Sequence, residues 1–261
     1  MRTSSKITGV TILVLLVVTG LIWAAALRAD RQGLLTVSFL SAGKGGAVLI
    51  EAPSGREVII DGGSDASILR SLGTRLPWYQ RSLDIVIAAH PDAAHATGLI
   101  DVLQRYSVDY IFQSSAQGSG PVWATFEKTV ADVRAKGTKV MTLQRGRVID
   151  LGSTGSPQAA HAYIEILFPD RDLSAASASA GCIEMQLVYG ATSFMLSCGN
   201  TAVENYLVRL DGIGLRSDVL SIDDGAGATS SALFTGFVGA QSVAQRGMTF
   251  VSDGQTVRPG H

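Results

Sequence analysis

The sequence predicts an α/β fold of four layers, in which two β-sheets pack face to face and helices cover both outer surfaces. Two features of the pattern predict this fold: a strand-rich half is followed by helices and then by a second strand-rich half, and no internal repeat is evident. The 261 residues suffice for one large domain with its own core. The net charge of −1 gives no general attraction to nucleic acid, so DNA binding would need a local basic patch.

The individual elements follow from apolar periodicity, which has a period of two in half-buried strands and of 3.6 in amphipathic helices. The stretch 83–88 is continuously apolar, which is typical of a buried central strand. Predicted strands lie, in chain order, at 36–40, 47–51, 57–61, 83–88, 108–112, 139–143, 147–151, 163–168, 183–189, 193–198, 218–222 and 248–252. Predicted helices lie at 65–76, with Asp65 as its N-cap, and at 96–106, 122–135 and 201–210.

An uncharged apolar stretch lies at the N-terminal end. Residues 7–27 contain no charge, and these 21 residues would span about 31 Å as a helix, which matches the core of a bilayer. Arg2 and Lys6 precede the stretch, and because positive residues stay in the cytoplasm, the remainder of the chain is expected outside it. Ala24-Ala25-Ala26 leaves a signal-peptidase site as the second interpretation. We therefore divide the chain into residues 1–30, a single-pass membrane anchor or signal peptide, and 31–261, an extracytoplasmic domain.

The two cysteines flank a predicted hairpin. Strands 183–189 and 193–198 would bring Cys182 near Cys198, and an oxidising compartment would favour a disulfide between them. A two-residue turn, however, pairs Cys198 with Ile183 and leaves Cys182 one position off. The sequence thus leaves two interpretations open, a disulfide and two buried free thiols.

The segment Ala89-His90-Pro91-Asp92-Ala93-Ala94-His95 follows the predicted central strand and carries the residue types of a metal-binding loop. Imidazole nitrogens and carboxylate oxygens are ligands of zinc and similar ions, whereas the methyl group of Ala94 supplies no lone pair. Open α/β sheets place their sites beyond the carboxyl ends of such strands. His90, Asp92 and His95 are therefore candidate ligands, with one ligand position lost at Ala94.

These residues carry a resemblance to a known family. Residues 35–106 resemble the metallo-β-lactamase-like domain of ComEC-type competence (DNA-uptake) proteins, and weaker similarity extends to about residue 231. The Ile-Asp-Gly-Gly motif of that domain is intact at Ile60-Asp61-Gly62-Gly63. Its metal loop His-x-Asp-x-Asp-His keeps His90, Asp92 and His95, and its opening turn is matched by 40–46 with both acids lost.

Two later motifs depart further from the family pattern. The family's Thr-Gly-Asp, whose aspartate bridges two metals, is matched by Cys198-Gly199-Asn200. Its Val-Pro-His-His-Gly-Ser is matched by 222–227, so that Asp224 stands in place of a histidine. The resemblance implies that one metal would keep His90 and Asp92 and the other only His95. We expect no two-metal centre, because too few donors remain to hold two cations.

Two hypotheses on function follow. In the first, the chain is a membrane-anchored, catalytically inactive binding or scaffold protein without a metal, whose cleft holds DNA or a cell-envelope protein, with a role in DNA uptake. In the second, it is a metal-dependent hydrolase acting on phosphodiesters. A single zinc or manganese ion would then be held by His90, Asp92 and His95, with Asp223 or Asp224 as a substitute ligand. The sequence does not identify a small-molecule partner.

Structural roles are the simpler expectation for several of these residues. Asp61 is expected to form a turn with the glycines that follow it. Asn200 is expected to cap the helix at 201–210, and the residues of the His90 loop to hydrogen-bond one another and cap the helix that follows them.

Overall fold

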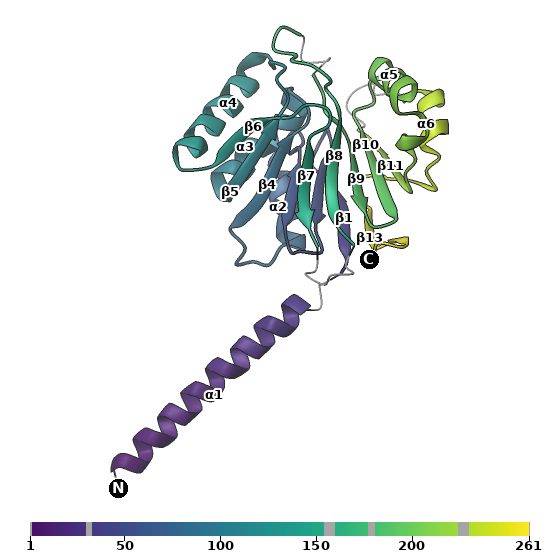
Figure 1. Ribbon diagram of the computed structural model, residues 1–261. Coiled ribbons are helices and arrows are strands. Elements are labelled where there is room, and N and C mark those ends of the chain that lie inside the picture. The colour runs from purple at the N-terminus through teal and green to yellow at the C-terminus, as the bar shows by residue number, and fades with distance from the viewer. Residues whose placement is uncertain (1, 30–32, 154–159, 177–180, 224–229, 261) are drawn as a thin grey trace.

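The computed structural model describes residues 2–29, 33–153, 160–176, 181–223 and 230–260 (Figure 1). The first sheet has the order β14-β13-β1-β2-β3-β4-β5-β6, and the second has the order β12-β11-β10-β9-β8-β7. The strands of the first sheet are β1 (Leu35–Leu40), β2 (Ala47–Glu51), β3 (Glu57–Ile60), β4 (Ser82–Ala88), β5 (Ser107–Gln113), β6 (Lys139–Thr142), β13 (Thr249–Ser252) and β14 (Val257–Pro259). Those of the second are β7 (Val148–Gly152), β8 (Ala162–Phe168), β9 (Glu184–Tyr189), β10 (Thr192–Ser197), β11 (Val219–Ile222) and β12 (Ser242–Val243).

Helices cover both outer faces of the sheet pair (Figure 1). The first sheet is covered by α2 (Ser67–Arg75), α3 (Ala93–Arg105) and α4 (Gly120–Ala135), and the second by α5 (Thr201–Asp211), the 3₁₀ helix η2 (Gly212–Leu215) and α6 (Ala232–Val238). The predicted four-layer α/β architecture is therefore confirmed.

Three apolar cores hold the layers together. The central core lies between the two sheets, because alternate residues of each strand point to the partner sheet; Val37 and Ile87 of the first sheet and Leu187 and Phe194 of the second belong to it. The other two cores join each sheet to its helices. Burial on both faces explains why the strand 83–88 is continuously apolar in the sequence.

Several predicted boundaries differ from the structure. Helix α3 begins at Ala93, three residues before the predicted start, because Asp92 caps it. Asp65 is not the N-cap of α2, since Ala66 holds that position without a side-chain bond, and Asp65 accepts from Ser67 N at 2.8 Å instead. The elements η2, α6, β12 and β14 were not predicted, being short or of weak periodicity.

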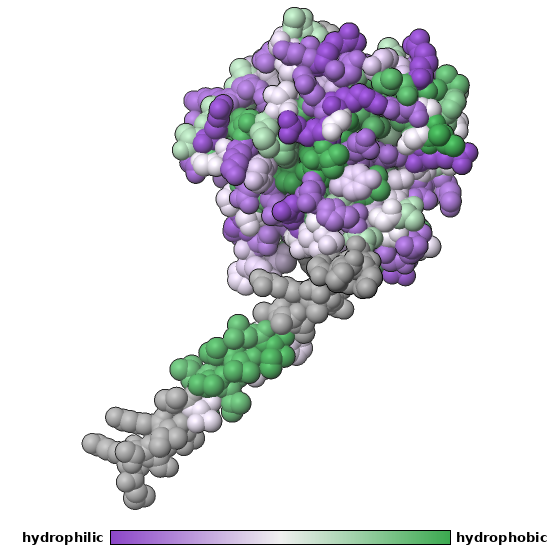
Figure 2. Space-filling view, in the orientation of Figure 1, coloured by the Kyte–Doolittle hydropathy of each residue, from purple (hydrophilic) through white to green (hydrophobic). Residues whose placement is uncertain are grey.

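The first helix, α1 (Arg2–Ala29), carries exposed apolar side chains in its described middle, between Ile12 and Trp23 (Figure 2). Within this described part of the chain, no helix is long and apolar enough to cross a membrane. The transmembrane helix predicted in residues 1–30 is thus not found there.

Cys182 and Cys198 form a disulfide with a Cα–Cα distance of 6.3 Å, so the interpretation of two free thiols is wrong. The predicted hairpin register is confirmed, since Leu196 pairs with Met185 and Thr192 with Tyr189. The register of β9 and β10 does not place Cys182 opposite Cys198. Because Cys182 precedes the start of β9, its backbone is not held by that pairing, and its side chain bonds to Cys198 diagonally.

The turn after β3 and helix α3 approach each other closely through glycines. Gly62 N donates to His95 O at 2.9 Å, and Gly98 N donates to Gly63 O at 3.0 Å. A Cβ on Gly62 would lie 2.2 Å from Leu99 N, and one on Gly98 would lie 1.9 Å from Gly62 O. Since these neighbours are backbone atoms, a side chain would push α3 away from the turn.

We predict that Gly62→Ala lowers the free energy of unfolding by about 1–3 kcal/mol, because the added methyl overpacks two backbone segments. Urea titration followed by circular dichroism measures this change. Gly73→Ala in α2 is the matched control, because a Cβ there meets no atom within 4 Å. Equal stability of the two variants would contradict the close approach of α3.

We predict that replacing both cysteines with serine lowers the free energy of unfolding by about 3 kcal/mol, because the crosslink spans a separation of 16 residues. The urea midpoint of the double variant measures it. Wild-type protein treated with a thiol reductant should unfold at the same midpoint as the variant. A reductant without effect on the wild type would argue against the crosslink.

Candidate metal site

The candidate site lies where parallel strands of both sheets end. Asp61 follows β3 and His90 lies just beyond β4, and these two strands are parallel neighbours in the first sheet. Asp223 follows β11, which runs parallel to β10 in the second sheet, and its N–H donates to Ser197 O at 2.8 Å. The carboxyl ends of the two strand pairs therefore bring residues distant in sequence to one place.

Asp61 orients the first histidine. Its side chain is buried, and Oδ1 accepts from Ala89 N at 2.8 Å and from His90 N at 3.3 Å. Oδ2 lies 2.7 Å from His90 Nδ1. Asp61 also has a φ of 55°, so it forms the turn as predicted, and the same turn aims its carboxylate at His90. A carboxylate at Nδ1 favours the tautomer in which Nε2 has a free lone pair.

Asp92 orients the second histidine. Its Oδ1 accepts from Ala94 N at 2.8 Å and from His95 N at 3.2 Å, which caps α3. The same oxygen lies 2.7 Å from His95 Nδ1. The predicted capping role is confirmed. The metal-loop interpretation expected Asp92 to be a ligand, and this prediction is wrong. Asp92 contacts His95 Nδ1, on the side of the ring away from Asp223, and so orients the imidazole instead.

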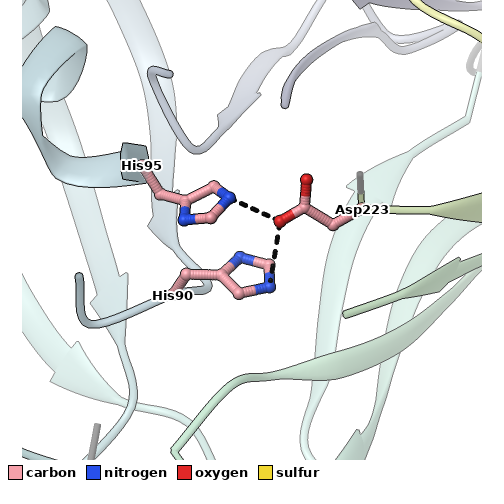
Figure 3. A group of neighbouring side chains, drawn as sticks. All are labelled: His90, His95 and Asp223. Atoms are coloured by element: carbon pink, nitrogen blue, oxygen red, sulfur yellow. Dashed lines mark ion pairs between the residues drawn. The ribbon is translucent and has the colours of Figure 1, made fainter. Parts of the chain in front are cut away.

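The front nitrogens of both histidines face Asp223 (Figure 3). Asp223 Oδ2 lies 3.4 Å from His90 Nε2 and closer still to His95 Nε2, while its Oδ1 accepts from Gly46 N at 3.2 Å. The two rings stack with centroids 4.2 Å apart. Both Nε2 atoms are buried, and in the described part of the chain each of them faces Asp223 Oδ2. Two imidazole nitrogens and one carboxylate oxygen therefore converge on one point.

The carboxylates around the site change its proton affinities. Burial alone would lower the pKa of His95, but Asp223 and Asp92 outweigh it and raise that pKa to about 10. Burial would raise the pKa of Asp223, but contact with His95 and the charge of His90 lower it to about 2. The pKa of Asp92 is lowered in the same way, since the bond from His95 outweighs its partial burial. Without a cation, His95 and Asp223 thus form an ion pair at neutral pH.

The donor set fits one divalent ion. Two imidazoles and one carboxylate are a recognised ligand set for zinc and for non-haem iron, and they leave a position open. The 3.4 Å from His90 Nε2 to Asp223 Oδ2 is close to the ligand–ligand separation of about 3.4 Å that metal bonds of about 2.0–2.1 Å give in a tetrahedron, whereas His95 Nε2 lies closer to the same oxygen and would have to move away from it to bind an ion. The carboxylate at each Nδ1 is the arrangement usual for metal-bound histidine.

The structure brings some predicted site residues together and separates others. His90, His95 and Asp223 converge, with Asp61 and Asp92 behind the imidazoles. Other predicted positions lie elsewhere: Asn200 caps α5 by accepting from Ala202 N and Val203 N, as predicted, Ala94 contributes its backbone N–H to the cap of α3, and Asp224 lies outside the described residues.

A second group of carboxylates was missed by the sequence analysis. Glu184 and Glu204 are both fully buried, and Ser197 Oγ lies 3.2 Å from Glu184 Oε1 and 2.9 Å from Glu204 Oε1. The single hydroxyl proton of Ser197 cannot be donated to both carboxylates. The second contact is satisfied when Glu184 is protonated and donates to Ser197 Oγ. Burial, together with the charge of Glu204, raises the pKa of Glu184 to about 8. Glu204 lies on the apolar face of α5 with Leu207 and Val208, a spacing that could have identified it.

Comparison with known proteins gives no assignment at the level of sequence. No protein-family model and no curated protein matches the chain. Among solved structures, the chain is similar to YhfI, a metallo-β-lactamase fold protein from Bacillus subtilis, with a TM-score of 0.49 and 13% identity over 84% of this chain and 100% of that one. It is also similar to a metallo hydrolase from the archaeon Ignicoccus hospitalis, with a TM-score of 0.48 and 12% identity over 84% and 98% of the two chains.

A third similar structure is the Zn²⁺-bound PqqB of Methylobacterium extorquens, with a TM-score of 0.45 and 12% identity over 72% of each chain. The order of layers in the structure, with two sheets between two layers of helices, is the order implied by the resemblance noted in the sequence. The finer resemblance, to the ComEC-type domain, stays a prediction.

We predict that the stability of the protein falls as pH rises from about 4.5 to about 8, because the pKa of Glu184 is about 8 in the fold against an ordinary 4.5. This raised pKa stabilises the fold below 4.5, and the contribution is lost as pH rises through 8. Glu184→Gln should remove this dependence between pH 4.5 and 6.5 and weaken it from 6.5 to 8, where the raised pKa of His95 adds its own loss of stability; each group contributes at most about 1.4 kcal/mol per pH unit. Thermal melting at a series of pH values measures it.

Asp132→Asn, at an exposed position of α4, is the control and should keep the wild-type pH profile. Parallel profiles for wild type and Glu184→Gln would show that Glu184 is ionised throughout.

Proposed function

We propose that the chain is a metallo-β-lactamase-like hydrolase with a single divalent ion, held by His90, His95 and Asp223. The observation that carries this proposal is the convergence of two buried Nε2 atoms on one carboxylate oxygen. Asp223 takes the role of a missing ligand; it lies in the segment 222–227, one residue before Asp224, which stands in place of a family histidine. This is the single-metal hypothesis of the sequence analysis with Asp223 in place of Asp92.

Each residue of the site has a distinct task. A bound divalent ion would polarise a substrate oxygen and lower the pKa of a bound water towards about 7. Asp61 and Asp92 keep the two imidazoles in one tautomer and one orientation, so that their Nε2 lone pairs face the same point. Asp223 supplies negative charge, and Gly46 N fixes the direction of its carboxylate. Burial limits competition from water.

A second candidate is the metal-free binding or scaffold protein. The close contact of His95 Nε2 with Asp223 Oδ2 favours this candidate. A proton held between these two atoms gives each of them a hydrogen-bonding partner, so that no ion is needed there. The cleft would then hold its partner by shape and hydrogen bonds alone. Metal stoichiometry separates the two candidates.

Export and membrane anchoring remain part of the proposal. The disulfide supports an oxidising compartment, because crosslinks of this kind are rare in the cytosol. The exposed apolar side chains of α1 support attachment to a membrane as a single-pass anchor. A DNA partner, and with it a role in DNA uptake, has less support, since the net charge is −1 and the site contains several carboxylates.

We predict that purified protein binds about one zinc or manganese ion per chain, because one set of three ligands is present. His90→Ala, His95→Ala and Asp223→Ala should each abolish stoichiometric binding. Asp61→Asn should weaken it by about 10–100-fold, since Asp61 acts through His90. Titration calorimetry with elemental analysis measures stoichiometry and affinity.

His161→Ala is the matched control, because His161 is exposed and pairs only with the exposed Asp150 in the described structure. Binding that survives His95→Ala would exclude the proposed ligand set. A wild-type protein that binds no ion at all would leave the metal-free candidate.

A further inference from the structure

A cavity opens beside the candidate metal site. Its volume is about 450 Å³, and His90, Asp61 and Asp223 line one end of it. This volume lies within the range of cavities that bury small molecules, which is roughly 300–1,000 Å³. The site therefore adjoins a space large enough for a ligand.

The walls of the cavity are mostly apolar and come from both sheets. Val48 and Ile60 lie on the first sheet, and Met185 and Leu196 lie on the second. Ile60, Met185 and Leu196 are between 1% and 7% exposed, so the cavity enters the central core. An apolar group placed there would be removed from water on most sides, which favours its binding.

The polar side chains that line the cavity beside the candidate metal site already have hydrogen-bonding partners within the protein. Asp61 accepts from the backbone and His90, and Asp223 faces both histidines and accepts from Gly46 N. Arg246, which also lines the cavity, donates to Gly43 O. A ligand in the cavity thus meets these polar side chains together with the apolar walls.

The charges of the site disfavour an anionic phosphodiester. Asp61, Asp92 and Asp223 place three negative charges around the histidines. One divalent ion together with Arg246 offsets these charges and leaves no positive charge for a phosphate. Nucleic acids are bound mainly through excess positive charge, which this site does not offer.

We infer that the cavity binds the acyl chain of a small neutral carboxylic ester, and that the ester carbonyl lies at the His90 and Asp223 end. The hydrolytic step rests on the proposed single-metal function. The oxygen of a water molecule bonds to the carbonyl carbon, and the bond from that carbon to the alcohol oxygen breaks. The alcohol leaves with one proton of the water, and the acid product releases the other.

The first test uses protein freed of metal by a chelator, so that it does not depend on hydrolysis. The fluorescent apolar dye N-phenyl-1-naphthylamine is bound and then displaced by neutral primary amides of increasing chain length, from acetamide to octanamide. Each methylene buried should tighten binding about three- to fourfold. Val48→Phe, which fills the cavity, should abolish the dependence on chain length. Val148→Phe, at an exposed position, should retain it.

The second test measures hydrolysis with zinc or manganese present. The value of kcat/KM should rise from p-nitrophenyl acetate to butyrate to octanoate and exceed that for bis-p-nitrophenyl phosphate. Amide binding that strengthens with chain length, in a protein without hydrolytic activity, would support the acyl cavity and contradict the metal-dependent hydrolase. Binding independent of chain length in the wild type, or hydrolysis of the phosphodiester in preference to the esters, would overturn the acyl-ester inference.

Discussion

The hydrogen bond that the Nδ1 of each imidazole donates to a carboxylate is the constraint on which the candidate site depends. Asp61 holds His90 and Asp92 holds His95, each at 2.7 Å, so both rings present the same nitrogen to Asp223. Without these bonds, either ring could rotate about its side-chain torsions and offer the wrong nitrogen. The backbone serves the same purpose, because the glycine turn after β3 and the cap of α3 fix where both carboxylates lie.

Much of the fold could be predicted, because burial leaves a direct mark on local sequence. The apolar stretch before His90 predicted the central strand β4, and Asn200 was predicted as a cap from its position directly before a helix. For the His90 loop a capping role was predicted, but the start of the helix was placed three residues too late. Half of the site was also predictable, since His90 and His95 share one short loop. The role of Asp223 was only one of several possibilities, because local pattern does not show that β11 ends opposite that loop.

What could not be predicted depends on contacts between distant segments. Asp92 looked like a ligand because spacing alone does not show which side of an imidazole a carboxylate will contact. Glu184 was assigned simply to a strand, because its neighbour Glu204 lies on a separate helix. The disulfide was undecided for a related reason: the hairpin register was foreseen correctly, but the departure of Cys182 from the ladder was not.

The strand order of the first sheet has a consequence for how the protein is made. β1 pairs with β2 on one side and with β13 on the other, so Val37 contacts both Ile50 and Phe250. During synthesis, this edge of β1 therefore stays open until β13 has been made, and β1 offers unpaired backbone groups throughout that interval. A fragment that lacks β13 would expose this edge and would be prone to aggregate.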